Sequence, residues 1–104
     1  MQELALSPEV IELVGDAAFP VVEALDMPIA RERVARAARP ALEDLCDRTD
    51  LPRELHAWAR SALIAVRGIL QGDPLAYASF LRSTHKMLVL SGLPAPSELA
   101  ADDE

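Results

Sequence analysis

Basic side chains that could bind an anionic group recur at helical spacing in the segment 51–71. Arg53, His56, Arg60 and Arg67 are separated by steps of three, four and seven residues, and Gln71 continues the series. With about 3.6 residues per helical turn, this spacing places them along one side of a helix. Guanidinium groups bind carboxylates and phosphates through charge-assisted hydrogen bonds. The pattern is typical of the ordinary polar face of an amphipathic helix; the functional alternative is a basic ridge that binds an acidic protein surface or a phosphate.

Residues that could act as nucleophiles or metal ligands are isolated from one another. Cys46, His56 and His85 have no nucleophile motif around them, and the two histidines lie 29 residues apart. The sequence holds no His pair at i and i+4, no Glu-x-x-His ligand set and no glycine-rich phosphate loop. We therefore expect no catalytic, cofactor-binding or metal site, and we expect that the protein is not an enzyme.

The charge of the chain is acidic overall but unevenly distributed. Seventeen acidic and ten basic residues give a net charge of −7, which disfavours nucleic acids and anionic membranes as partners because both attract positive surfaces. Residues 1–26 hold six acidic residues and no basic one, residues 27–97 have a balance of +3, and residues 98–104 hold four acidic residues. The acidic first segment and the basic middle are expected to pair within one subunit or across a dimer, unless both simply face water.

Length and composition indicate one small domain. The chain has 104 residues, of which 51% are hydrophobic, and one cysteine. This length supports a core without metals or disulfides, and a single cysteine excludes an internal disulfide. The first residues lack a basic and apolar leader, and the longest uncharged run has eleven residues, whereas a membrane span needs about twenty. We expect a cytoplasmic protein without membrane contact, folded as a single domain over residues 1–96.

Alanine and leucine, which favour helices, dominate the composition, and no stretch alternates with the period of a strand. We predict an all-α fold, a small bundle of four main helices with antiparallel neighbours. Ser7, Asp50 and Asp73 are expected to cap helix starts, because their side chains can accept a backbone N–H. The helices are expected at residues 8–26 with a kink or a break at Pro20, 28–47 with a kink at Pro40, 51–71 and 74–90, followed by a frayed acidic tail at 97–104.

Small side chains follow one line along the third predicted helix. Ala57, Ser61, Ala65 and Gly68 recur at steps of four and three residues, and small side chains let a second helix approach closely. We expect this line to pack inside the subunit, with the alanine-rich segment 35–38 as the candidate neighbour.

The segment 42–64 has the outline of a helix-turn-helix. Arg53, His56 and Arg60 would stand near the start of its second helix, where a recognition helix contacts DNA. The turn lacks glycine, however, and acidic residues flank it on both sides. A DNA-binding regulator is therefore the third of our functional hypotheses.

The leading hypothesis comes from the amount of apolar surface. Ile64, Phe80 and Met87 lie beside the main apolar stripes of their helices, and apolar patches left exposed often mark contact with another protein. We predict a non-enzymatic interaction module, an adaptor, accessory subunit or small regulator, that forms a helix-packed homodimer.

The second hypothesis is an acidic neutralising partner, such as an immunity protein, antitoxin or inhibitor, that covers a basic target. Opposite charges would make such an association fast and sensitive to salt. The acidic side chains available for it all lie in the first 26 residues, namely Glu3, Glu9, Glu12, Asp16, Glu23 and Asp26.

Overall fold

Four α-helices form where the sequence predicts them. The computed structural model describes residues 6–100, and these contain no strand. The all-α prediction is confirmed, and the helix ends agree with the predicted ones to within three residues. The elements in chain order are α1 (Pro8–Asp26), α2 (Arg31–Asp47), α3 (Arg53–Leu70), α4 (Ala76–Leu90) and the 3-10 helix η1 (Ser97–Ala100).

Local chemistry explains most of the helix ends. The Ser7 side chain accepts a hydrogen bond from the backbone N–H of Val10 at 3.3 Å, as expected of an N-cap. Gly72 and Gly92 follow α3 and α4 with φ angles of +89° and +73°, a backbone conformation that favours glycine and ends a helix.

Three helices begin two or three residues later than predicted, and Pro28, Pro52 and Pro74 precede their starts by three, one and two residues. A proline keeps the residue before it out of the helical conformation, and this excludes Leu51 from α3. The prediction that Asp50 caps α3 is wrong: Pro52 is the N-cap residue and makes no side-chain cap bond. Conversely, Pro20 and Pro40 lie inside α1 and α2, which continue through them, so the chain does not break at Pro20.

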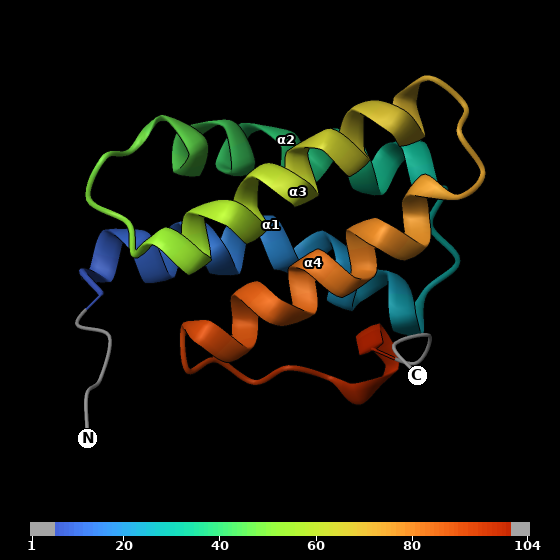
Figure 1. Cartoon of the computed structure of the whole chain (residues 1–104). Helices are drawn as coiled ribbons and strands as arrows, with labels where there is room; N and C mark the ends of the chain where they lie inside the picture. The colour runs from blue at the N-terminus through green and yellow to red at the C-terminus, as the bar shows by residue number, and fades with distance from the viewer. Residues whose placement is uncertain (1–5, 101–104) are drawn as a thin grey trace.

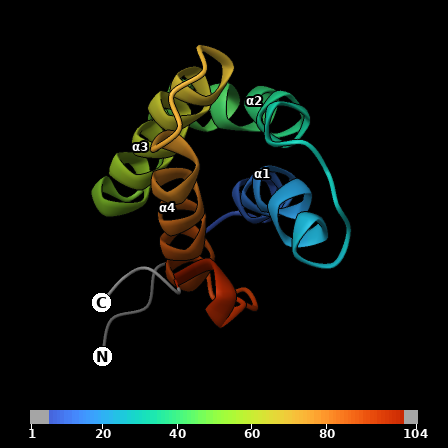
Figure 2. The same ribbon diagram turned by 90° about the vertical axis from the view of Figure 1, so that its right-hand side faces the viewer.

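The helices form a ring in which each one contacts the next in sequence, and α4 also contacts α1. Viewed along the bundle, α1 and α3 occupy opposite corners, with α2 and α4 between them (Figures 1 and 2). The outward sides of α1 and α3 therefore point away from each other. This placement matters because the charges of α1 are all acidic, whereas α3 carries three exposed arginines.

The core contains two residues that we expected on a partner surface. Phe80 and Met87 are both 0% exposed, so the prediction that they contact a partner is wrong. The reason is the position of α4, which packs against α3, α1 and η1 and buries a wider arc than a helix with two neighbours. The Phe80 ring meets the Tyr77 ring edge-on, with centroids 6.2 Å apart.

The chain after α4 returns along that helix and closes the core (Figure 1). Leu99, in η1, is 2% exposed and belongs to the same apolar cluster as Val10 in α1. The expectation that the segment from residue 97 onward frays is therefore wrong up to Leu99, because an apolar side chain anchors it. Residues 101–104 of the predicted tail lie outside the described residues.

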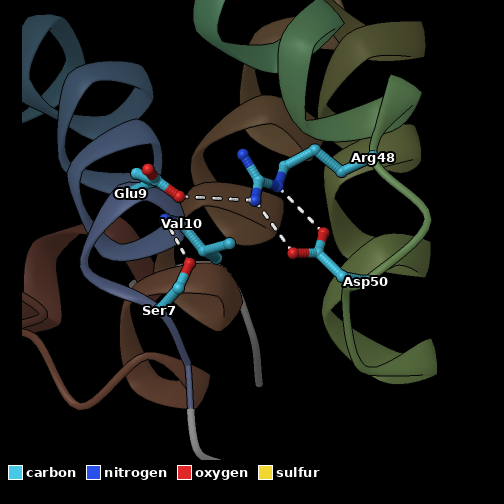
Figure 3. A network of polar contacts seen from close by, with 5 residues as sticks. All are labelled: Ser7, Glu9, Val10, Arg48 and Asp50. Atoms are coloured by element: carbon cyan, nitrogen blue, oxygen red, sulfur yellow. Dashed lines mark hydrogen bonds and ion pairs between the residues drawn. The ribbon is translucent and has the colours of Figure 1, made fainter.

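Arg48 joins the turn between α2 and α3 to the start of α1 (Figure 3). Its guanidinium donates two hydrogen bonds to the carboxylate of Asp50, at 2.9 and 2.8 Å, and lies 3.8 Å from a carboxylate oxygen of Glu9. The hydrogen bonds from Arg48 lower the pKa of Asp50. This arrangement occupies the carboxylate that we expected to cap α3.

Candidate functional site

The outward side of α3 carries an apolar side chain between two arginines. Ile64 is 61% exposed, and Arg60 and Arg67 stand four residues before it and three residues after it, both exposed. Arg53, also exposed, lies one further step of seven residues toward the start of the helix. These four residues, Arg53, Arg60, Ile64 and Arg67, are called the α3 face below.

A groove runs along one side of the α3 face, toward α4. Its volume is about 740 Å³, and its walls include Arg60, Ile64 and Arg67 together with the exposed Leu75 of the turn before α4. Leu75 was not among the predicted site residues, because a single apolar residue in a turn gives no periodic signal. The floor of the groove is made of small residues, Ala57, Ser61, Ala65, Gly68 and Ala76.

Two of the small residues on α3, Ser61 and Gly68, pack against α4. The Ser61 and Ser83 hydroxyls are hydrogen-bonded at 2.9 Å, and a Cβ added at Gly68 would lie only 3.0 Å from the Cβ of Ala76. Close packing inside the subunit agrees with our expectation, but the neighbour in these contacts is α4 rather than the alanine-rich segment 35–38.

A second groove, of about 610 Å³, lies on the other side of the α3 face, toward α2. Arg60, Ile64 and Arg67 line it as well, so these three residues form a ridge between two grooves. The opposite wall belongs to the end of α2 and includes Glu43, Cys46 and Asp47. The ridge is therefore accessible from both sides.

His56 lines the groove toward α2 together with Arg60 and Arg67, but its ring has a partner within the chain. Its Nε2 lies 3.1 Å from the backbone carbonyl oxygen of Cys46 at the end of α2, and because a carbonyl can only accept, the ring N–H donates. The half-buried His56 therefore ties α3 to the last turn of α2. The structure assigns it a positioning contact, and the predicted basic ridge consists of the three arginines.

The arginines of the α3 face are available for an external partner. Among residues 6–100, Arg53, Arg60 and Arg67 take part in no ion pair. Arg39 and Arg48, by contrast, pair with Glu43 and Asp50 at 2.9 and 2.8 Å. Unpaired guanidinium groups beside an exposed apolar side chain favour an anionic partner that also brings apolar surface.

An exposed aromatic residue, Phe19, lies on the outward side of α1. Phe19 is 63% exposed; Asp16 and Glu23 stand three residues before it and four residues after it, and Glu12 continues the line. These residues, Glu12, Asp16, Phe19 and Glu23, are called the α1 face below. Sequence reasoning had singled out the acidic residues but not Phe19, whose position between them was the signal available.

Neither chemistry nor similarity assigns an activity to these faces. Residues 6–100 contain no group of three or more His, Cys, Asp or Glu side chains that could hold a metal ion. In the same range, every helix is too short or too polar to cross a membrane. Comparison with known protein families, curated proteins and solved structures found no match. The α3 face and the α1 face are the features of the described residues that bear on function.

Cys46 gives a test of the groove between α2 and α3. Burial raises the pKa of its thiol, and the nearby Arg60 guanidinium partly offsets this rise. Since the folded pKa lies above the unfolded one, the thiol favours folding below the unfolded pKa, and this contribution is lost as the pH rises through the folded pKa.

We predict that near pH 8, about where free thiols titrate, Cys46 reacts with Ellman's reagent more slowly in the folded than in the unfolded protein. Arg60→Gln should raise the pKa further and slow the reaction at that pH. The pH profile of the reaction rate measures both effects. A midpoint at or below that of the unfolded chain would contradict the prediction.

Proposed function

We propose that the protein is a non-enzymatic protein–protein interaction module, an adaptor, accessory subunit or small regulator, whose α3 face binds an acidic amphipathic helix of a partner. The observation that carries the proposal is the exposed Ile64 between two unpaired arginines, with a groove on either side. An apolar anchor surrounded by polar groups is the usual composition of a binding hot spot.

The chemistry of the face indicates the kind of partner. Ile64 lies about one helical turn from Arg60 and from Arg67. An acidic helix can therefore place one carboxylate against each arginine and an apolar side chain against Ile64. Nucleic acid fits less well, because its phosphate backbone offers no apolar side chain for the exposed Ile64. The partner is therefore inferred to be a protein segment that is both acidic and apolar.

A second candidate function is supported by the α1 face. Its acidic residues surround the exposed Phe19, an arrangement that suits a basic target with an apolar pocket. Such a neutralising partner would bind through α1 and leave the α3 face free. Mutations on the two faces distinguish the two candidates.

The leading proposal is tested with a fluorescent helical peptide that carries acidic residues seven positions apart and a leucine three positions after the first, the spacing that fits the α3 face when the peptide runs antiparallel to α3. We expect it to bind the protein, and we expect Arg60→Glu with Arg67→Glu to weaken binding at least about tenfold, because two charge contacts become repulsive. Fluorescence anisotropy at low ionic strength measures the affinity.

The matched control reverses two other exposed arginines, Arg36 on α2 and Arg82 on α4, with the same change in net charge. Arg36→Glu with Arg82→Glu should leave peptide binding nearly unchanged. An equal loss in both double variants would show that total charge attracts the peptide and would overturn the proposal. So would the absence of binding by the unsubstituted protein.

A further inference from the structure

The α1 face and the α3 face match each other residue by residue when the two helices run antiparallel. On α3, Ile64 lies four residues after Arg60, and Arg67 lies three residues further. On α1 the order is read backwards, from the C-terminal end of the helix. Glu23 comes first, Phe19 follows after four residues, and Asp16 follows after three more. The order of charge, apolar residue and charge is the same, with the signs of the charges reversed.

The match extends to distances along the helix axis. Seven residues rise about 10.5 Å in an α-helix, so the two acids and the two arginines have the same separation. In the antiparallel alignment Phe19 lies opposite Ile64. In a parallel alignment it would be one residue out of step with Ile64, which is about 100° around the helix. The spacing therefore selects the antiparallel orientation.

The charged residues of the α1 face are also unpaired. Among residues 6–100, Asp16 and Glu23 take part in no ion pair, and they lie in a helix whose own segment contains no basic residue. In the ring of helices α1 and α3 occupy opposite corners (Figure 2), so the two faces of one copy cannot satisfy each other. A second copy offers the complementary face.

We infer that the partner of the α3 face is the α1 face of a second copy of this chain, docked antiparallel. Glu23 then pairs with Arg60, Asp16 pairs with Arg67, and Phe19 packs on Ile64. The inference rests on the proposed function, since it names the occupant of the same face. The two faces lie on opposite corners of the bundle, so the copy that uses its α3 face still has a free α1 face, and its partner still has a free α3 face. Further copies can therefore add head to tail.

The contact is expected to be weak and dependent on salt. Stable interfaces bury about 800 Å² on each partner, and a contact centred on three side chains of each copy is expected to bury less than that. The charge contacts are exposed to solvent, so salt screens them. Association should therefore increase with protein concentration and decrease with added salt.

The experiment is sedimentation velocity between about 10 µM and about 1 mM protein, a range suited to a weak interface. We expect the sedimentation coefficient of the unsubstituted chain to rise with concentration in low salt. Two double variants, Asp16→Arg with Glu23→Arg and Arg60→Glu with Arg67→Glu, should each remain monomeric. An equimolar mixture of the two should associate again, because the reversed α1 face of the first complements the reversed α3 face of the second.

Controls and alternative outcomes separate this inference from the proposed function. Glu32→Arg with Asp44→Arg reverses two exposed acids of α2 and should associate as the unsubstituted chain does. Circular dichroism verifies that every variant is folded. A chain that stays monomeric at all concentrations, or a mixture that fails to associate, overturns the inference. If the acidic peptide still binds the α3 face in that case, the proposed function stands and the partner is another protein.

Discussion

Phe80→Ala is expected to lower the free energy of unfolding by about 3 to 5 kcal/mol, the largest effect of any single substitution considered. The Phe80 side chain is fully buried and packs edge-on against Tyr77. Its removal loses the transfer free energy of the ring and leaves a cavity between α4 and its neighbours. Urea denaturation followed by circular dichroism measures the change.

The matched substitution is Phe19→Ala, which truncates the same side chain at an exposed position. We expect it to change the free energy of unfolding by no more than about 0.5 kcal/mol. The pair thus separates a core role from a surface role for each phenylalanine. Equal destabilisation by both substitutions would contradict the assignment of Phe80 to the core and Phe19 to the surface.

Ser83→Leu is expected to produce the second largest effect. Ser83 is 1% exposed at the contact of α4 with α3 and shares a hydrogen bond with Ser61. A leucine there must push the two helices apart, and such overpacking costs about 1 to 3 kcal/mol. The lost hydrogen bond adds about 1 kcal/mol.

Ser83→Ala isolates the hydrogen bond, because it removes the hydroxyl without adding volume. We expect this variant to lose only about 1 kcal/mol, so the difference between the two variants reports the packing of α3 on α4. Thermal and urea unfolding give both values. If leucine were tolerated as well as alanine, the close contact of these helices would be refuted.

The sequence was sufficient for the helices because their signals are local. A serine cap before α1, glycines after α3 and α4, and apolar residues at helical spacing each act within a few residues. The late start of α3 has a local cause too, since Pro52 keeps Leu51 out of the helical conformation. The role of Asp50 could not be predicted from such signals, because the Arg48 guanidinium binds the carboxylate that would otherwise accept a backbone N–H at the start of α3.

The candidate site was only partly predictable, because exposure depends on which helices are neighbours. Ile64 and Phe80 both lie beside the main apolar stripe of their helices, yet Ile64 is exposed and Phe80 is buried. The difference arises because α4 packs against three elements, α3, α1 and η1, whereas α3 packs mainly against α2 and α4. The outward side of α3 therefore stays uncovered. Periodicity gives the direction of a side chain from its helix, whereas packing decides what covers it.

The burial of Leu99 in the same apolar cluster as Val10 has a consequence for synthesis of the protein. Val10 and Leu99 belong to one core, although almost the whole described chain separates them. A core whose members lie so far apart in sequence requires a long loop to close, which slows folding. While the chain is being made, helices can form in turn as they leave the ribosome, but the core that holds them is completed only after Leu99 has emerged.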